Sequence, residues 1–372
     1  MGGILHCLQT GGLRLNDPVA GIGKVPLALR HQLEDAGYLT ASRFFDTAIQ
    51  EHVHAVLLVG STTGSPLPGS RAPWFLNHEF RRLQQQGIAV IVRSDDLPPA
   101  PPGLTWPNNV HLVSPQLATG VRMRDGQLVH CCDARGSLHF RESDSHRIVF
   151  ADTVPSTALL SQSPQTYWAC GIGSGDSLRY LVTGVPQSGG FDSPSNAAPV
   201  WFALQSDQVT SSRRIACEAV GWHTEAVDIT AVSTGDDFQE MLAGRLRRIA
   251  SHAAVPTLVR FRLSGQSDAL ITLTDDVMHQ LQQRDWGLVW PVETDINARS
   301  IQLVETHAWP VAREILSDLL AATPINLSEQ CEIPVGQTRA DLRIVPRSGT
   351  SAIEDRILKR LLWDLTASAR SA

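Results

Sequence analysis

The first third of the chain alternates short apolar segments with longer segments in which apolar residues recur at helical spacing. Strands are predicted at 3–8, 54–60, 88–93 and 110–114, because short segments rich in Val, Ile and Leu are typical of strands buried on both faces. The apolar stripes of 27–51 and 74–86 predict helices between them. This order indicates a layered α/β domain, in which ligands usually bind at the carboxyl ends of the strands.

From about Val121 the pattern changes to short strands joined by turns. Asp125-Gly126 lies between two such strands and predicts a hairpin, so we expect a second sheet to begin here. The stretch 182–199 is rich in Gly, Ser and Pro, which predicts a loop. Further strands are expected at 200–204 and 213–220.

The last part of the chain predicts a smaller α/β unit and a terminal helix. Helices are expected near 236–252 and 275–283, with a strand at 257–263 between them. In the terminal helix, apolar residues recur every four positions at Ile353, Ile357, Leu361 and Leu365. One face of this helix is therefore apolar, and it either docks within the protein or binds a partner.

Length, composition and charge indicate a protein with a large buried core and no overall attraction to nucleic acid. The 372 residues are 42% apolar, which suits one large domain and a smaller one. With 31 basic and 37 acidic residues the net charge is -6, so any DNA binding must be local.

Cellular location is also an expectation from the sequence. The six cysteines are scattered without a C-x-x-C pair, and we expect reduced thiols in a cytoplasm. No apolar run approaches the roughly 18 to 20 residues that a membrane helix needs. The chain opens with Met-Gly-Gly directly before a strand-like segment, so we expect no targeting peptide and no membrane partner.

Several segments follow one another in the order of motifs from a known enzyme family. The family motif H-T-A-D-L-H-L-D-S-P aligns without a gap with Gln9-Thr-Gly-Gly-Leu-Arg-Leu-Asn-Asp-Pro18. The family's next motif, an aliphatic strand ending in G-D, aligns with Val56–Ser61. Ile88–Asp96 lies on a strand ending in G-N-H-D, and Trp106–Leu112 matches W-P-x-N-V-H-V. By these motifs the chain resembles the SbcD-like DNA repair exonucleases of the calcineurin-like metallophosphoesterase superfamily.

Later motifs extend the resemblance over roughly residues 3 to 320. Val149–Thr153 matches an L-H-T strand, and 167–174 matches Y-W-A-L-G-H-V-H. Segments 183–188 and 257–265 are similar to the family's P-G-N-P-Q-G loop and to a capping-domain strand. The resemblance implies a four-layer α/β/β/α sandwich over 1–208, a small α/β capping domain over 209–322 and a tail with an amphipathic helix over 323–372.

The family's chemistry depends on residues that this chain lacks. Its members hydrolyse phosphodiesters with two metal ions, usually manganese, held by Asp, His and Asn, and the ions activate the attacking water. The positions that match its ligands carry Gly12, Arg14, Ser61, Asp95, Asp96, Asp152, Ile172 and Ser174. Because few of these are ligands for hard cations, we predict no catalytic residue, no di-metal centre and no cofactor where the family would use two manganese ions.

Other arrangements of ligands stay open on the sequence. Asp95, Asp96 and Asp152, with His6 and Asp17, are candidates for a relocated metal site, although Asp95 and Asp96 beside a Pro-Pro pair are also ordinary turn residues. His130 and Cys132 share one face of a strand and are a weaker zinc candidate. His52 and His54 are expected to be surface or packing residues.

A phosphate site without metal is a further hypothesis. Arg14, together with Arg71 or Arg93, would accept a phosphate through charge-assisted hydrogen bonds. The alternative is that Arg14 pairs within the protein with Asp17 or Asp152.

The resulting functional expectation is a non-catalytic paralogue of a repair exonuclease that acts as a scaffold or regulatory subunit. The alternatives are an active phosphoesterase or exonuclease with a rearranged metal site, and a module that binds DNA ends. The resemblance implies an SbcC-like coiled-coil ATPase as partner, contacted by the helix that carries Ile353 to Leu365, and a homodimer.

Overall fold

The computed structural model describes most of the chain up to residue 296. The described residues are 3–17, 27–65, 67, 69–116, 118–136, 146–162, 165–173, 175–191, 198–230, 232, 234–265 and 277–296. None of their helices is long and apolar enough to cross a membrane. The chain forms two compact units, one made of 1–224, 249–260 and 286–293 and the other of 225–248, 261–285 and 294–372.

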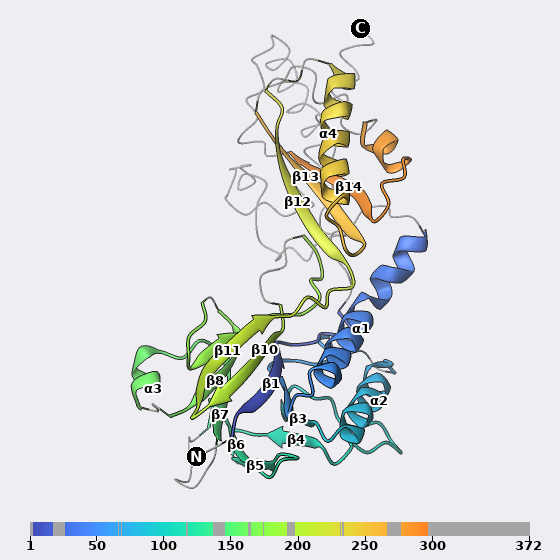
Figure 1. The fold of residues 1–372 in the computed structure, drawn as a ribbon. Coiled ribbons are helices and arrows are strands. Elements are labelled where there is room, and N and C mark those ends of the chain that lie inside the picture. The colour runs from blue at the N-terminus through green and yellow to red at the C-terminus, as the bar shows by residue number, and fades with distance from the viewer. Residues whose placement is uncertain are drawn as a thin grey trace, which may run out of the picture. The chain divides into compact units, whose positions relative to one another are not determined.

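The first unit contains a six-stranded sheet of order β11-β10-β1-β2-β3-β4 (Figure 1). Its strands are β1 (Leu5–Thr10), β2 (Ala55–Leu58), β3 (Ala89–Arg93), β4 (Val110–Val113), β10 (Val200–Gln205) and β11 (Gln208–Arg214). Strands β1 to β4 are parallel, whereas β10 runs antiparallel to β1. The carboxyl ends of β1, β2 and β3 therefore meet at one edge of the sheet.

Alternation along these strands distributes side chains between two cores. Cys7, Leu57 and Ile91 lie in one buried cluster, and the next residue of each strand lies in another. The second cluster also holds Phe44, Phe45 and Phe80 from the helices α1 (Leu27–Gln50) and α2 (Ala72–Gln85). These helices cover one face of the sheet (Figure 1), which explains why the strands are apolar on both faces.

A second, five-stranded sheet has the order β5-β6-β7-β8-β9. Its strands are β5 (Thr119–Arg122), β6 (Leu128–Asp133), β7 (His146–Thr153), β8 (Tyr167–Ile172) and β9 (Tyr180–Val182). The turn at Asp125-Gly126 joins β5 to β6 in an antiparallel hairpin, as predicted, and β6 to β9 are parallel. Their carboxyl ends likewise share one edge.

The two sheets pack face to face through the first cluster. That cluster includes Leu5, Leu57 and Ile91 from one sheet and Ile148 and Tyr167 from the other. On the outer face of the five-stranded sheet, Leu160 of the short helix α3 (Thr157–Gln162) packs against a smaller buried group that includes Cys132. This mixed α/β arrangement of helices and parallel sheets is consistent with the fold of a metallophosphoesterase.

One expected strand lies elsewhere. The strand predicted at 213–220 is wrong, because β11 begins at Gln208 and ends at Arg214. Ser206 and Asp207 have positive φ angles of 50° and 62°, so the chain reverses sharply after β10 and the next strand starts early. The first sheet consequently extends to Arg214, and the expected division into 1–208, 209–322 and 323–372 stays a prediction.

Further elements are β12 (Gly221–Asp228), α4 (Gly235–Ala250), β13 (Thr257–Ser264) and β14 (Val289–Ile296), and residues 277–282 are helical within the helix predicted near 275–283. The three strands form a sheet of order β12-β13-β14. In α4, Phe238, Leu242 and Leu246 are buried at helical spacing. The predicted terminal helix with Ile353, Ile357, Leu361 and Leu365 lies outside the described residues.

Candidate functional site at the strand ends

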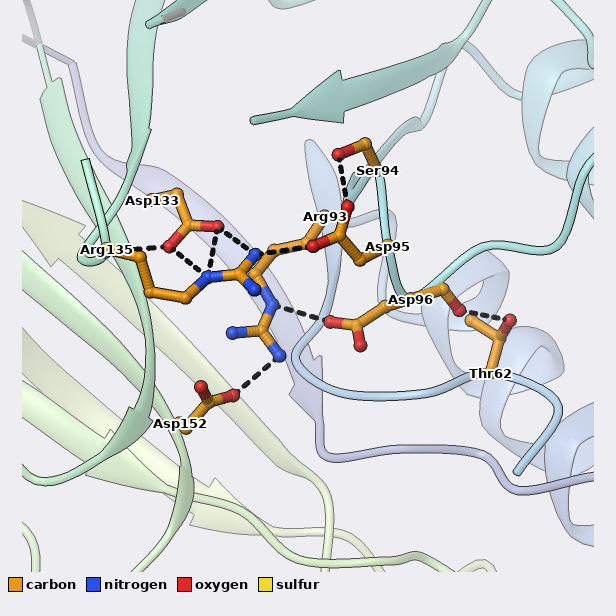
Figure 2. Close-up of polar contacts among 8 residues, drawn as sticks. All are labelled: Thr62, Arg93, Ser94, Asp95, Asp96, Asp133, Arg135 and Asp152. Carbon is orange, nitrogen blue, oxygen red and sulfur yellow. Dashed lines mark hydrogen bonds and ion pairs between the residues drawn. The ribbon is translucent and has the colours of Figure 1, made fainter. Parts of the chain in front are cut away.

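Charged side chains gather where the carboxyl ends of the two sheets face each other (Figure 2). Arg93 ends β3, Asp133 ends β6 and Asp152 lies one residue before the end of β7. Asp95 and Asp96 follow β3, and Arg135 follows β6. We call these six residues the strand-end cluster: Arg93, Asp95, Asp96, Asp133, Arg135 and Asp152.

Arg93 joins the two sheets. Its Nε donates to Asp96 Oδ2 at 2.6 Å, and its Nη2 pairs with Asp152 Oδ1 at 2.6 Å. Only 6% of the Arg93 side chain is exposed, against 56% for Asp152. A buried guanidinium needs such partners, because an unpaired charge is costly at low dielectric constant.

Arg135 makes a second bridge between the sheets. Its Nη2 lies 2.6 Å from Asp133 Oδ2 and 3.0 Å from Asp95 Oδ2. Arg135 also donates its backbone N–H to Asp133 Oδ1 at 2.9 Å. The cluster thus holds four carboxylates and two guanidinium groups, which leaves negative charge in excess.

Pairing shifts the pKa of Arg93 and that of Asp133 in opposite directions, each toward the charged form. Burial by itself would lower the pKa of Arg93, but hydrogen bonds to Asp152 and Asp96 and the charges of both outweigh it, so the pKa is raised. Burial would raise the pKa of Asp133, but hydrogen bonds from Arg135 and its charge lower it below the ordinary value. Pairing therefore favours the charged forms of Arg93 and Asp133.

The backbone also holds Asp96 in place. Thr62, just after β2, donates its backbone N–H at 2.9 Å and its hydroxyl at 2.7 Å to the Asp96 carbonyl oxygen. The Asp96 N–H donates to the Arg93 carbonyl oxygen at 3.1 Å. Hydrogen bonds to its backbone alone therefore connect Asp96 to the ends of β2 and β3.

Gly12 has no room for a side chain. A Cβ placed on it would lie 2.6 Å from the carbonyl oxygen of Ser61 and 3.2 Å from the Ser61 nitrogen. Such close approach of two backbones favours glycine. An aspartate ligand at Gly12 would require the turns after β1 and β2 to separate.

Ser61 and Arg14 are engaged within the protein. The Ser61 hydroxyl accepts the Gly64 N–H at 2.9 Å. Arg14, with 54% of its side chain exposed, pairs with Asp17. Arg14 therefore makes the internal pairing that we expected as the alternative to phosphate binding.

The three arginines of the hypothesised phosphate site are paired within the protein. Arg71 pairs with Asp35 and stacks over the Tyr38 ring, with its Cζ 3.9 Å from the ring centroid. Arg14 and Arg93 are paired as described above. Each of the three arginines thus already has a carboxylate partner.

Other candidate ligands are not brought together. His6 lies near the start of β1, where its ring contacts those of His54 and Trp201 at 5.6 and 5.4 Å between centroids. Cys131 and Cys132 lie in different cores, as alternation requires. Ile172 ends β8, and Ser174 lies outside the described residues.

The sequence did not reveal a buried polar link between the two sheets, centred on Gln9. Gln9 Nε2 donates to the Leu181 carbonyl at 3.0 Å and to Thr183 Oγ1 at 3.1 Å, and Gln9 Oε1 accepts the Tyr167 hydroxyl at 2.6 Å. Gln9 occupies the position of the first histidine in the family motif, and this position could have marked it as a residue of interest. The sequence analysis also did not select Asp133 and Arg135. An acidic and a basic residue two positions apart at the end of a predicted strand could have indicated them.

The residues present do not fit a pair of metal ions. Within the described ranges, no three His, Cys, Asp or Glu side chains are grouped so that they could hold a metal ion. The carboxylates that do converge are bound to Arg93 and Arg135. A divalent ion beside the Arg93 guanidinium would meet strong repulsion at this depth.

Comparison with known proteins gives one partial likeness. No family model matches the chain. Over 113 residues the chain is 29% identical to the uncharacterized metallophosphoesterase YhaO of Bacillus subtilis (strain 168). The match covers 30% of this chain and 28% of that protein. It supports the calcineurin-like metallophosphoesterase superfamily and does not single out the SbcD-like DNA repair family.

Proposed function

From this likeness to a metallophosphoesterase, we propose that the chain is a non-catalytic member of the superfamily that acts as a scaffold or regulatory subunit in DNA repair. The observation that carries the proposal is Arg93, a buried cation paired with Asp96 and Asp152 at the strand ends. In the resembling motif, this part of the chain supplies metal ligands. Here it supplies a positive charge.

Two more positions support the loss of catalysis. Gly12 and Ser61 stand where the family has aspartates, and their backbones approach too closely for a side chain on Gly12. Metal-dependent phosphoester hydrolysis relies on the ions to polarise the phosphoryl oxygen and to activate water. A chain without their ligands keeps the scaffold and loses the chemistry.

The finer architecture belongs to the same proposal. We propose that the helices and sheets of the first unit form the four-layer α/β/β/α sandwich and that a small capping domain follows it. By resemblance, an SbcC-like coiled-coil ATPase is the partner, and the chain forms a homodimer. Packing of α1 and α2 on the six-stranded sheet supports the sandwich.

Elemental analysis and a nuclease assay test the loss of catalysis. The full chain, purified and then loaded with manganese, is expected to retain well under one metal ion per chain and to degrade neither linear duplex nor single-stranded DNA. An intact SbcD-like exonuclease prepared in parallel is the positive control. About two ions per chain together with nuclease activity, as a two-metal mechanism requires, would contradict the proposal.

The alternative is an active phosphoesterase with a rearranged metal site. The observation behind it is that four carboxylates come together at the strand ends, where Arg93 and Arg135 now pair with them. Its signature would be activity that Asp152→Asn lowers by about 10- to 100-fold, the loss typical when a group that supports a metal site is removed. Activity that Asp152→Asn leaves unchanged would point to a contaminating nuclease.

A further inference from the structure

The two sheets of the first unit each end in a strand at their outer edge. Among the described strands, β11 is terminal in the six-stranded sheet and β9 is terminal in the five-stranded sheet. A terminal strand presents backbone N–H and C=O groups that can pair with a strand of another chain. Partners for these groups within the protein would close the edges to such pairing.

Hydrogen bonds to β8 show which backbone groups of β9 face outward. The N–H of Thr183 donates to the Cys170 carbonyl oxygen in β8 at 3.0 Å. Backbone groups alternate in direction from one residue to the next along a strand. Tyr180 and Val182 therefore direct their N–H and C=O groups away from β8, toward the open edge.

The turn before β9 and one arginine satisfy all of these outward groups. Tyr180 donates its N–H to Ser177 Oγ at 3.2 Å, and its carbonyl oxygen accepts the Ser177 N–H at 2.8 Å. Val182 donates its N–H to Asp176 Oδ1 at 3.0 Å. The Val182 carbonyl oxygen accepts a hydrogen bond from Arg214 Nη1 at 2.7 Å. The edge of β9 is thus capped within the protein.

The same turn also covers the terminal strand of the other sheet. The Leu178 carbonyl oxygen accepts the N–H of Val209 in β11 at 2.6 Å. Arg214, the last residue of β11, pairs through Nη2 with Asp176 Oδ2. One short segment therefore bonds to the edge strands of both sheets.

We infer that residues 176–178 and Arg214 form an edge strap, which closes the outer edges of both sheets and whose release lets these edges pair with a second copy of the chain. The strap is held by polar contacts more than by burial. Leu178 is 63% exposed, and the side chains of Asp176 and Arg214 are 39% and 40% exposed. Segments with few buried apolar contacts open locally at the lowest free energy.

The sequence of β11 suits pairing with a second copy. Two identical strands pair about a twofold axis, so each residue meets a residue at the mirrored position. In an antiparallel pair centred on Ser211, Arg213 and Arg214 of one copy lie opposite Val209 and Gln208 of the other. Like charges are then not directly opposed, which would be destabilising.

Breaking the strap in the full chain tests the inference. Asp176→Ala takes the acceptor from the Val182 N–H, and Arg214→Ala takes the donor from the Val182 carbonyl oxygen. Hydrogen exchange followed by mass spectrometry should show that residues 176–183 exchange at least about 5-fold faster in each variant, because outward hydrogen bonds of β9 are lost. Peptides that cover β2 and β3 should keep their wild-type rates.

Self-association is measured by sedimentation velocity over a range of micromolar concentrations. Asp176→Ala and Arg214→Ala should associate beyond the oligomeric state of the wild type, and more so as concentration rises. Asp35→Ala breaks another exposed ion pair, the one with Arg71. This matched control should behave as the wild type does in both measurements.

A charge swap separates an edge cap from an ordinary ion pair. In the double variant Asp176→Arg with Arg214→Glu, the two side chains still attract each other. A guanidinium, which only donates, now faces the Val182 N–H, and a carboxylate, which only accepts, faces the Val182 carbonyl oxygen. The swapped variant should therefore exchange and associate as the single variants do.

Four results would overturn the inference. Unchanged exchange at 176–183 in Asp176→Ala would show that the strap does not protect β9, and wild-type behaviour of the swapped variant would indicate an ordinary ion pair. Faster exchange without further association would show that the strap does not keep the edges from pairing. Exchange that rises equally in β2 and β3 would show that the pair supports the whole fold. The proposed function is tested separately, by metal content and nuclease activity.

Discussion

Asp133 is a buried carboxylate that is surrounded by donors of Arg135. Its side chain is fully buried and accepts hydrogen bonds from the backbone N–H, Nε and Nη2 of Arg135. These bonds explain why its pKa lies below the ordinary value although burial acts in the opposite direction. Asp133 therefore links the stability of the fold to pH.

The sign of this linkage follows from the direction of the pKa shift. A carboxyl whose pKa is lower in the folded state stabilises the protein above its unfolded pKa, about 3.9, and this contribution is lost as the pH falls through the folded pKa. We expect Asp133→Asn to lower the free energy of unfolding at pH 7 by about 1 to 3 kcal/mol. The variant should also lose less stability than the wild type between roughly pH 4 and pH 2.

Urea unfolding at pH 7 and near pH 3 measures both effects. Glu240→Gln, which removes an exposed carboxylate from α4, is the matched control and should leave the acid dependence almost unchanged. An Asp133→Asn variant with the acid dependence of the wild type would show that Asp133 does not contribute to it.

At the scale of elements, Gln9 ties β1 of one sheet to β8 and β9 of the other. Its amide nitrogen donates to Thr183 Oγ1 and to the Leu181 carbonyl oxygen, and its amide oxygen accepts a hydrogen bond from the Tyr167 hydroxyl. Gln9, Tyr167 and Thr183 are all fully buried. The apolar core between the sheets thus contains one polar link that favours a single register between them.

Replacing this link should be costly because buried partners would be left unpaired. We expect Gln9→Leu to lower the free energy of unfolding by about 2 to 4 kcal/mol, and Tyr167→Phe by about 1 to 2 kcal/mol. The double variant should lose less than the sum of the two, since the groups share one hydrogen bond. Denaturant unfolding of the four proteins measures this, and strict additivity would contradict a direct tie.

At the scale of the whole molecule, charge limits where a scaffold can bind. The chain carries a net charge of -6, and the strand-end cluster has carboxylates in excess of guanidinium groups. Both features disfavour the DNA backbone, whose binding depends on basic side chains. A scaffold role must therefore use another surface, and the amphipathic tail is the candidate that the sequence supplies.

Deletion of residues 353–372 tests the tail as the partner-binding segment. We expect the shortened chain to keep its far-ultraviolet circular dichroism apart from the contribution of the predicted helix. It should recover less than about a tenth of the proposed SbcC-like ATPase partner in a pull-down, since apolar helix faces bind partners through a few anchor residues. Replacing Ile357 and Leu361 by alanine is the milder matched variant. Undiminished recovery by the shortened chain would contradict the assignment.

Much of the layered fold was predictable from local pattern. The strands at 55–58, 89–93 and 110–113 and the helices at 27–50 and 72–85 lie within a few residues of their predicted positions, because burial on both faces leaves an apolar signature in the sequence. The strand expected at 213–220 failed because the reversal at Ser206 and Asp207 depends on backbone angles. Those angles carry no hydrophobic signal.

The sequence by itself determined which residues were missing from the strand ends. Gly12, Arg14 and Ser61 are poor ligands wherever they lie, since their chemistry is set by their side chains. Only the tertiary structure decided what replaced those ligands. Arg93 and Asp152 are 59 positions apart in the chain. They meet because the parallel strands of the two sheets have their carboxyl ends together, a juxtaposition that no local pattern encodes.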